Sequence, residues 1–163
     1  MKYPIIISLL LSVATAEDQT DGFVIEPSAK ALKYRPCSRP YVENIQGLWK
    51  VGAGELFEID PKLDSLLETT PKTGVKGTGL KTEDYQLQFL GLNVGKDSLI
   101  YINAFRRPSK MEAEAHLPDL KKEMVNLCDG GSSSWGAVWN KKSHQFIRFD
   151  VNGDKSLGSK KNE

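Results

Sequence analysis

The sequence predicts an α+β fold in which one main helix packs on a four-stranded antiparallel sheet. Two observations lead to this prediction. A leucine-rich pattern with helical spacing lies between Glu55 and Leu67, and four strand-like segments follow residue 84. Short polar loops join the first strand to the second and the third to the fourth, as in β-hairpins. A helix laid on one face of such a sheet buries the apolar side of both.

The helix is predicted from a single apolar face, formed by Leu56, Ile59, Leu63, Leu66 and Leu67. Pro61 interrupts this pattern. Either Asp60 caps a helix that begins at Pro61, or a short turn precedes a kink. In both cases the sequence predicts a helix over about 61–68.

The four strands are predicted over 85–94, 99–105, 134–140 and 145–151. In the first strand the apolar alternation changes phase beside Gly91, which predicts a bulge there. Trp135 and Trp139 lie on one face of the third strand. In the fourth, Ile147 alternates with two further apolar residues and is expected to share their face.

The first sixteen residues have the pattern of a secretory signal peptide. A basic start precedes an apolar run from Ile5 to Val13, and Ala14-Thr15-Ala16 is the small-x-small pattern that signal peptidase cleaves. The run is shorter than the roughly 20 residues that span a bilayer. We therefore expect a periplasmic or secreted protein without a membrane anchor after cleavage. Its predicted parts are a signal peptide over 1–16, an extended arm and connector over 17–46, an α+β domain over 47–153 and a polar tail over 154–163.

Cys37 and Cys128 are the two cysteines of the chain. In an exported chain they most simply form one disulfide, which would tie the connector to the segment before Trp135. A reactive thiol with a resolving partner is the alternative, and no Cys-x-x-Cys spacing favours it. The 22 basic and 21 acidic side chains nearly balance. No nucleic-acid partner is therefore expected.

One polar loop is the candidate contact surface for a partner. It consists of Asp129, Gly130, Gly131, Ser132, Ser133 and Ser134. The glycines favour a tight turn with positive φ. A serine of this loop with His144 and Asp129 would form a hydrolase triad, but the G-x-S-x-G pattern of a nucleophile elbow is absent. We therefore expect no catalytic residue and no enzyme.

No metal and no cofactor are expected. Asp150, Asn152 and Asp154 stand at the odd positions that a calcium loop uses, but lysines replace its glycine and its final glutamate. His116 and two nearby glutamates lie in one polar stretch, which is more typical of a surface than of a metal site.

Several short pieces from Tyr85 onward form a recognisable pattern. They are Tyr85 with Gly91, IYINAF over 100–105, CDGG over 128–131, Trp135-Gly136, Phe146 and Asn152-Gly153. In these pieces the chain resembles a group of small exported proteobacterial proteins of unassigned function. The resemblance covers roughly residues 47–153. It implies export and architecture, and it carries no catalytic residue.

A second, three-residue resemblance concerns Gly47-Leu48-Trp49, which matches the G-x-W motif near the start of lipocalins. A small-molecule carrier of this kind would have an apolar pocket lined by Trp49, Trp135 and Trp139. A lipocalin barrel needs eight strands, whereas four are predicted here. The predicted helix on a four-stranded sheet is instead the arrangement of cystatin-like folds.

The preferred function is a non-enzymatic exported binding protein. Small disulfide-bonded exported domains suit protein inhibitors and immunity-type factors, whose protein partners lie in the periplasm or outside the cell. The small-molecule carrier and the serine-loop hydrolase are the alternatives.

Overall fold

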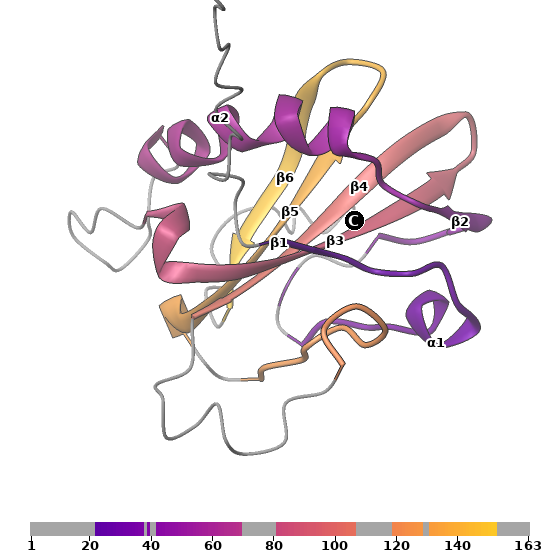
Figure 1. The fold of residues 1–163 in the computed structure, drawn as a ribbon, viewed down its shortest axis with the longest axis horizontal. Coiled ribbons are helices and arrows are strands. Elements are labelled where there is room, and N and C mark those ends of the chain that lie inside the picture. Colours follow the sequence, from indigo (N-terminus) through magenta and orange to yellow (C-terminus); the bar gives the residue numbers. More distant parts are fainter. Residues whose placement is uncertain are drawn as a thin grey trace, which may run out of the picture.

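The computed structural model describes residues 22–37, 39, 42–69, 81–106, 119–128 and 131–152. The predicted signal peptide, His116, Asp154 and the polar tail lie outside these residues. In chain order the elements are β1 (Gly22–Val24), α1 (Ala29–Leu32), β2 (Gly47–Trp49), α2 (Ala53–Thr69), the 3₁₀ turn η1 (Thr82–Asp84), β3 (Tyr85–Val94), β4 (Asp97–Arg106), the 3₁₀ turn η2 (Gly131–Ser133), β5 (Ser134–Asn140) and β6 (Gln145–Val151) (Figure 1).

The sheet is open, mixed and six-stranded, which corrects the predicted sheet of four antiparallel strands. The four predicted strands are present as the antiparallel series β3-β4-β5-β6. Two further strands pair with the free edge of β3: β1 runs parallel to it and β2 antiparallel. Each has three residues, too few to show a period of two, so the sequence pattern did not reveal them.

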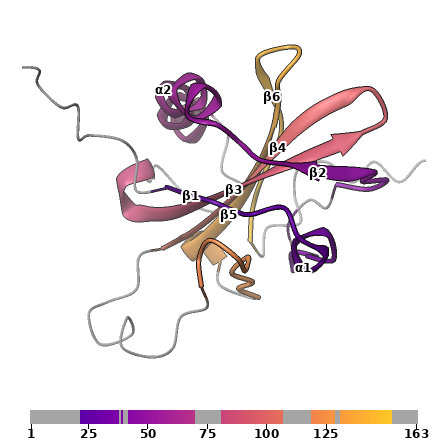
Figure 2. The same ribbon diagram turned by 45° about the vertical axis from the view of Figure 1, so that its right-hand side comes forward.

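Both faces of the sheet are covered. The helix face packs against α2 and contains Trp135, Trp139 and Phe89. The connector face, on the opposite side, packs against Ile25, Ala31, Tyr34, Val42 and Ile45. Figures 1 and 2 both show α2 on one side of the sheet and α1 on the other. The molecule therefore has three layers, and the middle one is the sheet.

Helix α2 begins eight residues before the predicted start, at Ala53. The carboxylate of Glu55 accepts a hydrogen bond from the Gly52 N–H at 3.0 Å, which stabilises this helix start. Pro61 therefore lies inside the helix and not at its first turn, so the predicted cap at Asp60 is wrong. The predicted apolar face is confirmed, because Ile59, Leu63 and Leu67 are buried.

No bulge occurs at Gly91, because β3 and β4 pair in one continuous register from Tyr85 to Val94. The apolar pattern changes phase because the two halves of β3 place their apolar residues on different faces: Phe89 lies on the helix face, and Leu90 and Leu92 lie on the connector face. Gly91 itself lies under Trp49. A Cβ atom at this position would stand 2.3 Å from the Trp49 carbonyl oxygen.

The bulge of this sheet lies instead between β5 and β6, where the register shifts beside Val138 and Trp139. Phe146, Phe149 and Val151 consequently pack on the helix face. Ile147 falls at the shift and is 50% exposed, so the prediction that it shares the face of Phe149 and Val151 is wrong.

Candidate functional site

The predicted disulfide is confirmed: Cys37 is bonded to Cys128, with 5.2 Å between their Cα atoms. Two hydrogen bonds run beside it. The side-chain oxygen of Asn126 accepts from the Cys37 N–H at 3.1 Å, and its amide nitrogen donates to the Arg35 carbonyl at 3.1 Å. The connector is thus attached to the segment 119–128.

The connector is not fully extended as predicted, because it contains the single helical turn α1. The Ser28 hydroxyl caps this turn by accepting a hydrogen bond from the Ala31 N–H at 3.1 Å. Before it, Ile25 is completely buried, so the N-terminal arm is held to the sheet at its apolar triplet. The connector thus packs on this face of the sheet instead of extending into solvent.

A buried polar network joins the sheet to the segment 119–128. Gln88 and Asn103 are paired residues of β3 and β4, and both are fully buried. The Gln88 amide nitrogen donates to the carbonyls of Leu120 and Glu123 at 3.0 and 2.8 Å. Its oxygen accepts from the Val125 N–H at 2.8 Å. These bonds take the place of solvent for polar groups that the sheet has buried.

The network continues into the connector through Arg39 and Tyr34. Arg39 donates to the side-chain oxygen of Asn103, and to the Trp135 carbonyl at 3.1 Å. The Tyr34 hydroxyl donates to the Val125 carbonyl at 3.2 Å and accepts from Arg39 at 3.4 Å. The arginine is 6% exposed, so its charge acts in a nearly solvent-free setting.

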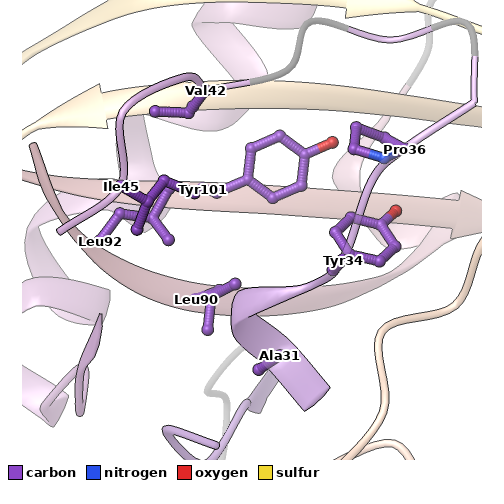
Figure 3. Close-up of a pocket in the computed structure, with 8 residues that line it drawn as sticks. All are labelled: Ala31, Tyr34, Pro36, Val42, Ile45, Leu90, Leu92 and Tyr101. Atoms are coloured by element: carbon purple, nitrogen blue, oxygen red, sulfur yellow. The ribbon is translucent and has the colours of Figure 1, made fainter. Parts of the chain in front are cut away.

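An apolar pocket lies on the connector face, between the connector and the sheet (Figure 3). Its volume is about 260 Å³ counting the part that is open to solvent, and about 20 Å³ when only the space that a water molecule can occupy is counted. Side chains from both layers line it: Ala31, Tyr34, Pro36, Val42 and Ile45 from the connector, and Leu90, Leu92 and Tyr101 from the sheet. The lining suits a small apolar group.

Two tyrosines, Tyr34 and Tyr101, line this pocket. In Figure 3 the ring of Tyr101 lies among the other lining side chains, and its hydroxyl points towards Pro36. Burial raises the pKa of both Tyr101 and Tyr34, and the Arg39 charge offsets part of the increase. Both phenols are therefore protonated near neutral pH and can donate hydrogen bonds.

The predicted contact loop is only partly described, because Asp129 and Gly130 lie outside the described residues. Gly131 has the expected positive φ, 52°. The Ser132 carbonyl accepts a hydrogen bond from the Tyr85 hydroxyl at 2.7 Å. Ser134 is fully buried at the start of β5. The described part of the loop is thus bound to the sheet.

The three tryptophans of the predicted pocket lie on the helix face. Trp135 and Trp139 are fully buried against α2, and the Lys62 ammonium lies 4.5 Å from the centre of the Trp139 ring. Trp49 is half-buried and donates to the Leu92 carbonyl at 3.2 Å. These side chains fill a core, and the pocket that the structure shows lies on the opposite face of the sheet.

The proposed serine triad does not assemble with His144. The serines precede β5 or open it, whereas His144 follows its other end. A strand of seven residues is about 20 Å long, far beyond hydrogen-bond reach. His144 instead contacts Glu58 of α2. Within the described ranges no group of three or more His, Cys, Asp or Glu side chains has the geometry to bind a metal.

Comparison with known proteins adds no assignment: no family model, no curated protein and no solved structure matches this chain. The resemblance to small exported proteobacterial proteins therefore stays a prediction. No helix in the described part of the chain is both long and apolar enough to cross a membrane. The functional argument rests on the geometry of the connector face.

Proposed function

We propose that this chain is an exported, non-enzymatic binding protein that holds a small apolar ligand in the pocket of the connector face. The pocket itself is the observation that carries the proposal. It is concave, its walls are almost wholly apolar, and two tyrosines contribute to its lining. The small-molecule carrier predicted from sequence thus becomes the leading candidate, with a different set of lining residues.

The construction of the pocket supports this proposal. Its floor consists of Leu90, Leu92 and Tyr101, which adjacent central strands of the sheet hold in place. Its cover is the connector, which the disulfide and the Arg39 bonds fix to the rest of the fold. A binding site on a rigid floor needs little ordering when the ligand arrives, which favours affinity. The disulfide also supports the periplasmic or secreted location.

Amide chemical shifts measured by NMR test the proposal, with cyclopentane as the apolar probe. We expect saturable shifts at Leu90, Leu92 and Tyr101. Val42→Phe should abolish them, because the larger side chain fills the pocket from the connector. Phe57→Ser, on the outer side of α2, is the matched control and should bind like the wild type. Absence of shifts in the wild type, or equal shifts in Val42→Phe, would overturn the proposal.

A protein partner, as an inhibitor or immunity-type factor would have, is the second candidate. Phe57 favours it, because this side chain of α2 is 80% exposed. Aromatic residues, Phe among them, are enriched at protein interfaces. In a pull-down from extracts of the source cells, a partner that binds there should be recovered by the wild type and by Val42→Phe, but not by Phe57→Ser. Equal recovery by all three proteins would show that the partner does not bind through Phe57.

A further inference from the structure

Strand β6 lies at one margin of the sheet, and β5 is the only strand of the described residues that pairs with it (Figure 1). Directly after β6, the Asn152 N–H donates to the Ser134 carbonyl of β5 at 2.9 Å. N–H groups alternate in direction along a strand, so those of Phe149 and Val151 point away from β5. Such an edge presents backbone donors and acceptors to another strand.

The charges of β6 are complementary to those of a second β6 strand. Arg148 and Asp150 lie on either side of Phe149 and share the connector face with Val138. The bulge precedes them, and the pairing with β5 is regular from Arg148 to Val151. If two β6 strands pair antiparallel about Phe149, Arg148 of each copy stands opposite Asp150 of the other. Pairing about Arg148 or about Asp150 would instead place like charges opposite each other, which is unfavourable.

We propose that two copies of this chain form a two-fold dimer by antiparallel pairing of their β6 strands, centred on Phe149. The Phe149 residues of the two copies then exchange two backbone hydrogen bonds, and an Arg148–Asp150 pair lies on each side of them. Ile147, which is 50% exposed, lies opposite Val151 of the second copy, so pairing removes apolar surface from water. The pocket contains no residue of β6, so this dimer is independent of the proposed ligand.

Sedimentation velocity of the full chain tests the dimer over concentrations from about 1 μM to about 1 mM, because a strand edge of this length makes a small interface. We expect the wild type to dimerise as its concentration rises. Arg148→Asp makes both charges of the strand acidic and Asp150→Arg makes both basic, so each variant alone should dimerise about tenfold or more weakly. An equal mixture of the two variants should regain dimerisation, because each acidic strand then faces a basic one. Lys142→Asp, in the exposed β5–β6 turn, is the control and should behave like the wild type.

Three outcomes would overturn the proposal. The first is a wild type that stays monomeric throughout this concentration range. The second is a dimer that Arg148→Asp, Asp150→Arg and Lys142→Asp all weaken equally or leave unchanged, because it must then form through another surface. The third is a mixture that dimerises no better than its two components, which would show that these charges do not face each other.

Amide hydrogen exchange of the wild type gives a second test that does not depend on the folding of any variant. Exchange of the Phe149 amide should slow as the protein concentration rises, because this amide is bonded only in the dimer. The Asn152 amide is bonded to Ser134 within one copy and should exchange at the same rate at every concentration. A Phe149 amide whose exchange does not change between monomer and dimer would contradict the pairing of the β6 strands.

Discussion

Asn103 and Gln88 face each other on adjacent central strands, and their side chains are joined by a hydrogen bond of 2.9 Å. The same Asn103 nitrogen donates to the Val125 carbonyl at 2.9 Å, and its oxygen accepts from Arg39. One buried amide therefore holds three segments together: the sheet, the connector and the residues 119–128. This connection keeps the cover of the pocket in place.

Replacing Asn103 with alanine should lower the free energy of unfolding by about 2–4 kcal/mol. The change removes one hydrogen-bond partner of Gln88 and one of the Arg39 guanidinium in a buried setting, which is costly. Urea unfolding measures the effect. Asn93→Ala is the control, because Asn93 is half-buried on β3 and its side-chain oxygen accepts a single bond of 3.5 Å from Ser98. Equal losses in the two variants would show that the network adds no stability.

Gly91→Ala should destabilise the fold by more than about 2 kcal/mol, whereas Gly54→Ala should not. A Cβ at Gly91 would meet the Trp49 carbonyl at 2.3 Å and its ring at 2.7 Å, so β2 must move. A Cβ at Gly54 has no neighbour within 4 Å, and alanine favours the helix by up to about 1 kcal/mol. Thermal unfolding of both variants tests this contrast, and a tolerated Gly91→Ala would contradict the packing of Trp49.

Removing the disulfide should lower stability by up to about 4–5 kcal/mol, because the bond closes a long loop with a sequence separation of 91. The double variant Cys37→Ser/Cys128→Ser tests this in urea. Reductant should lower the wild type to the stability of the double variant and leave the double variant unchanged. Wild-type stability that does not respond to complete reduction would show that the bond contributes nothing.

The ion pair between α2 and the β5–β6 turn should make stability depend on pH. A hydrogen bond from Lys141, with 2.6 Å between Nζ and Oε1, holds the pKa of Glu55 below its ordinary value of 4.5. A carboxyl whose pKa is lower in the folded state stabilises the fold above its unfolded pKa. This contribution is lost as the pH falls through the folded value.

Glu55→Gln keeps the acceptor for Gly52 and removes the charge. Between pH 6 and pH 3 its free energy of unfolding should therefore fall by less than that of the wild type. The difference between the two proteins should be under about 1 kcal/mol, because the pair is partly exposed. Glu68→Gln, an exposed position on the same helix, is the control and should follow the wild type. Parallel curves of unfolding free energy against pH for Glu55→Gln and the wild type would show that the ion pair does not contribute to the pH dependence of stability.

The sequence predicted those elements whose apolar pattern spans enough residues to show its period. The strands β3, β5 and β6 begin and end where expected, and the face of α2 is the predicted one. The disulfide followed from the presence of two cysteines. The start of α2 was missed because Pro61 is typical of the first turn of a helix. In the structure the helix begins at Ala53, where Glu55 accepts a hydrogen bond from the Gly52 N–H.

The connector face could not be predicted in this way. Gln88 alternates with apolar neighbours and therefore resembles a solvent-facing residue, yet it is fully buried. Its burial depends on contacts across 32–37 residues of sequence, with Leu120 and Val125, which no local pattern encodes. One signal was present: LIYINAF, over 99–105, is apolar on both faces, which is typical of a strand that is covered on both sides.

The position of the bound ligand is the most direct test of the central claim. An NMR titration with cyclopentane, read at assigned amides, compares Leu90 and Tyr101 on the connector face with Ile59 and Leu63 in α2. The account predicts saturable shifts at the first pair and none at the second. Shifts centred on α2, or no saturable shift at any amide, would contradict the claim that this protein binds its ligand between the connector and the sheet.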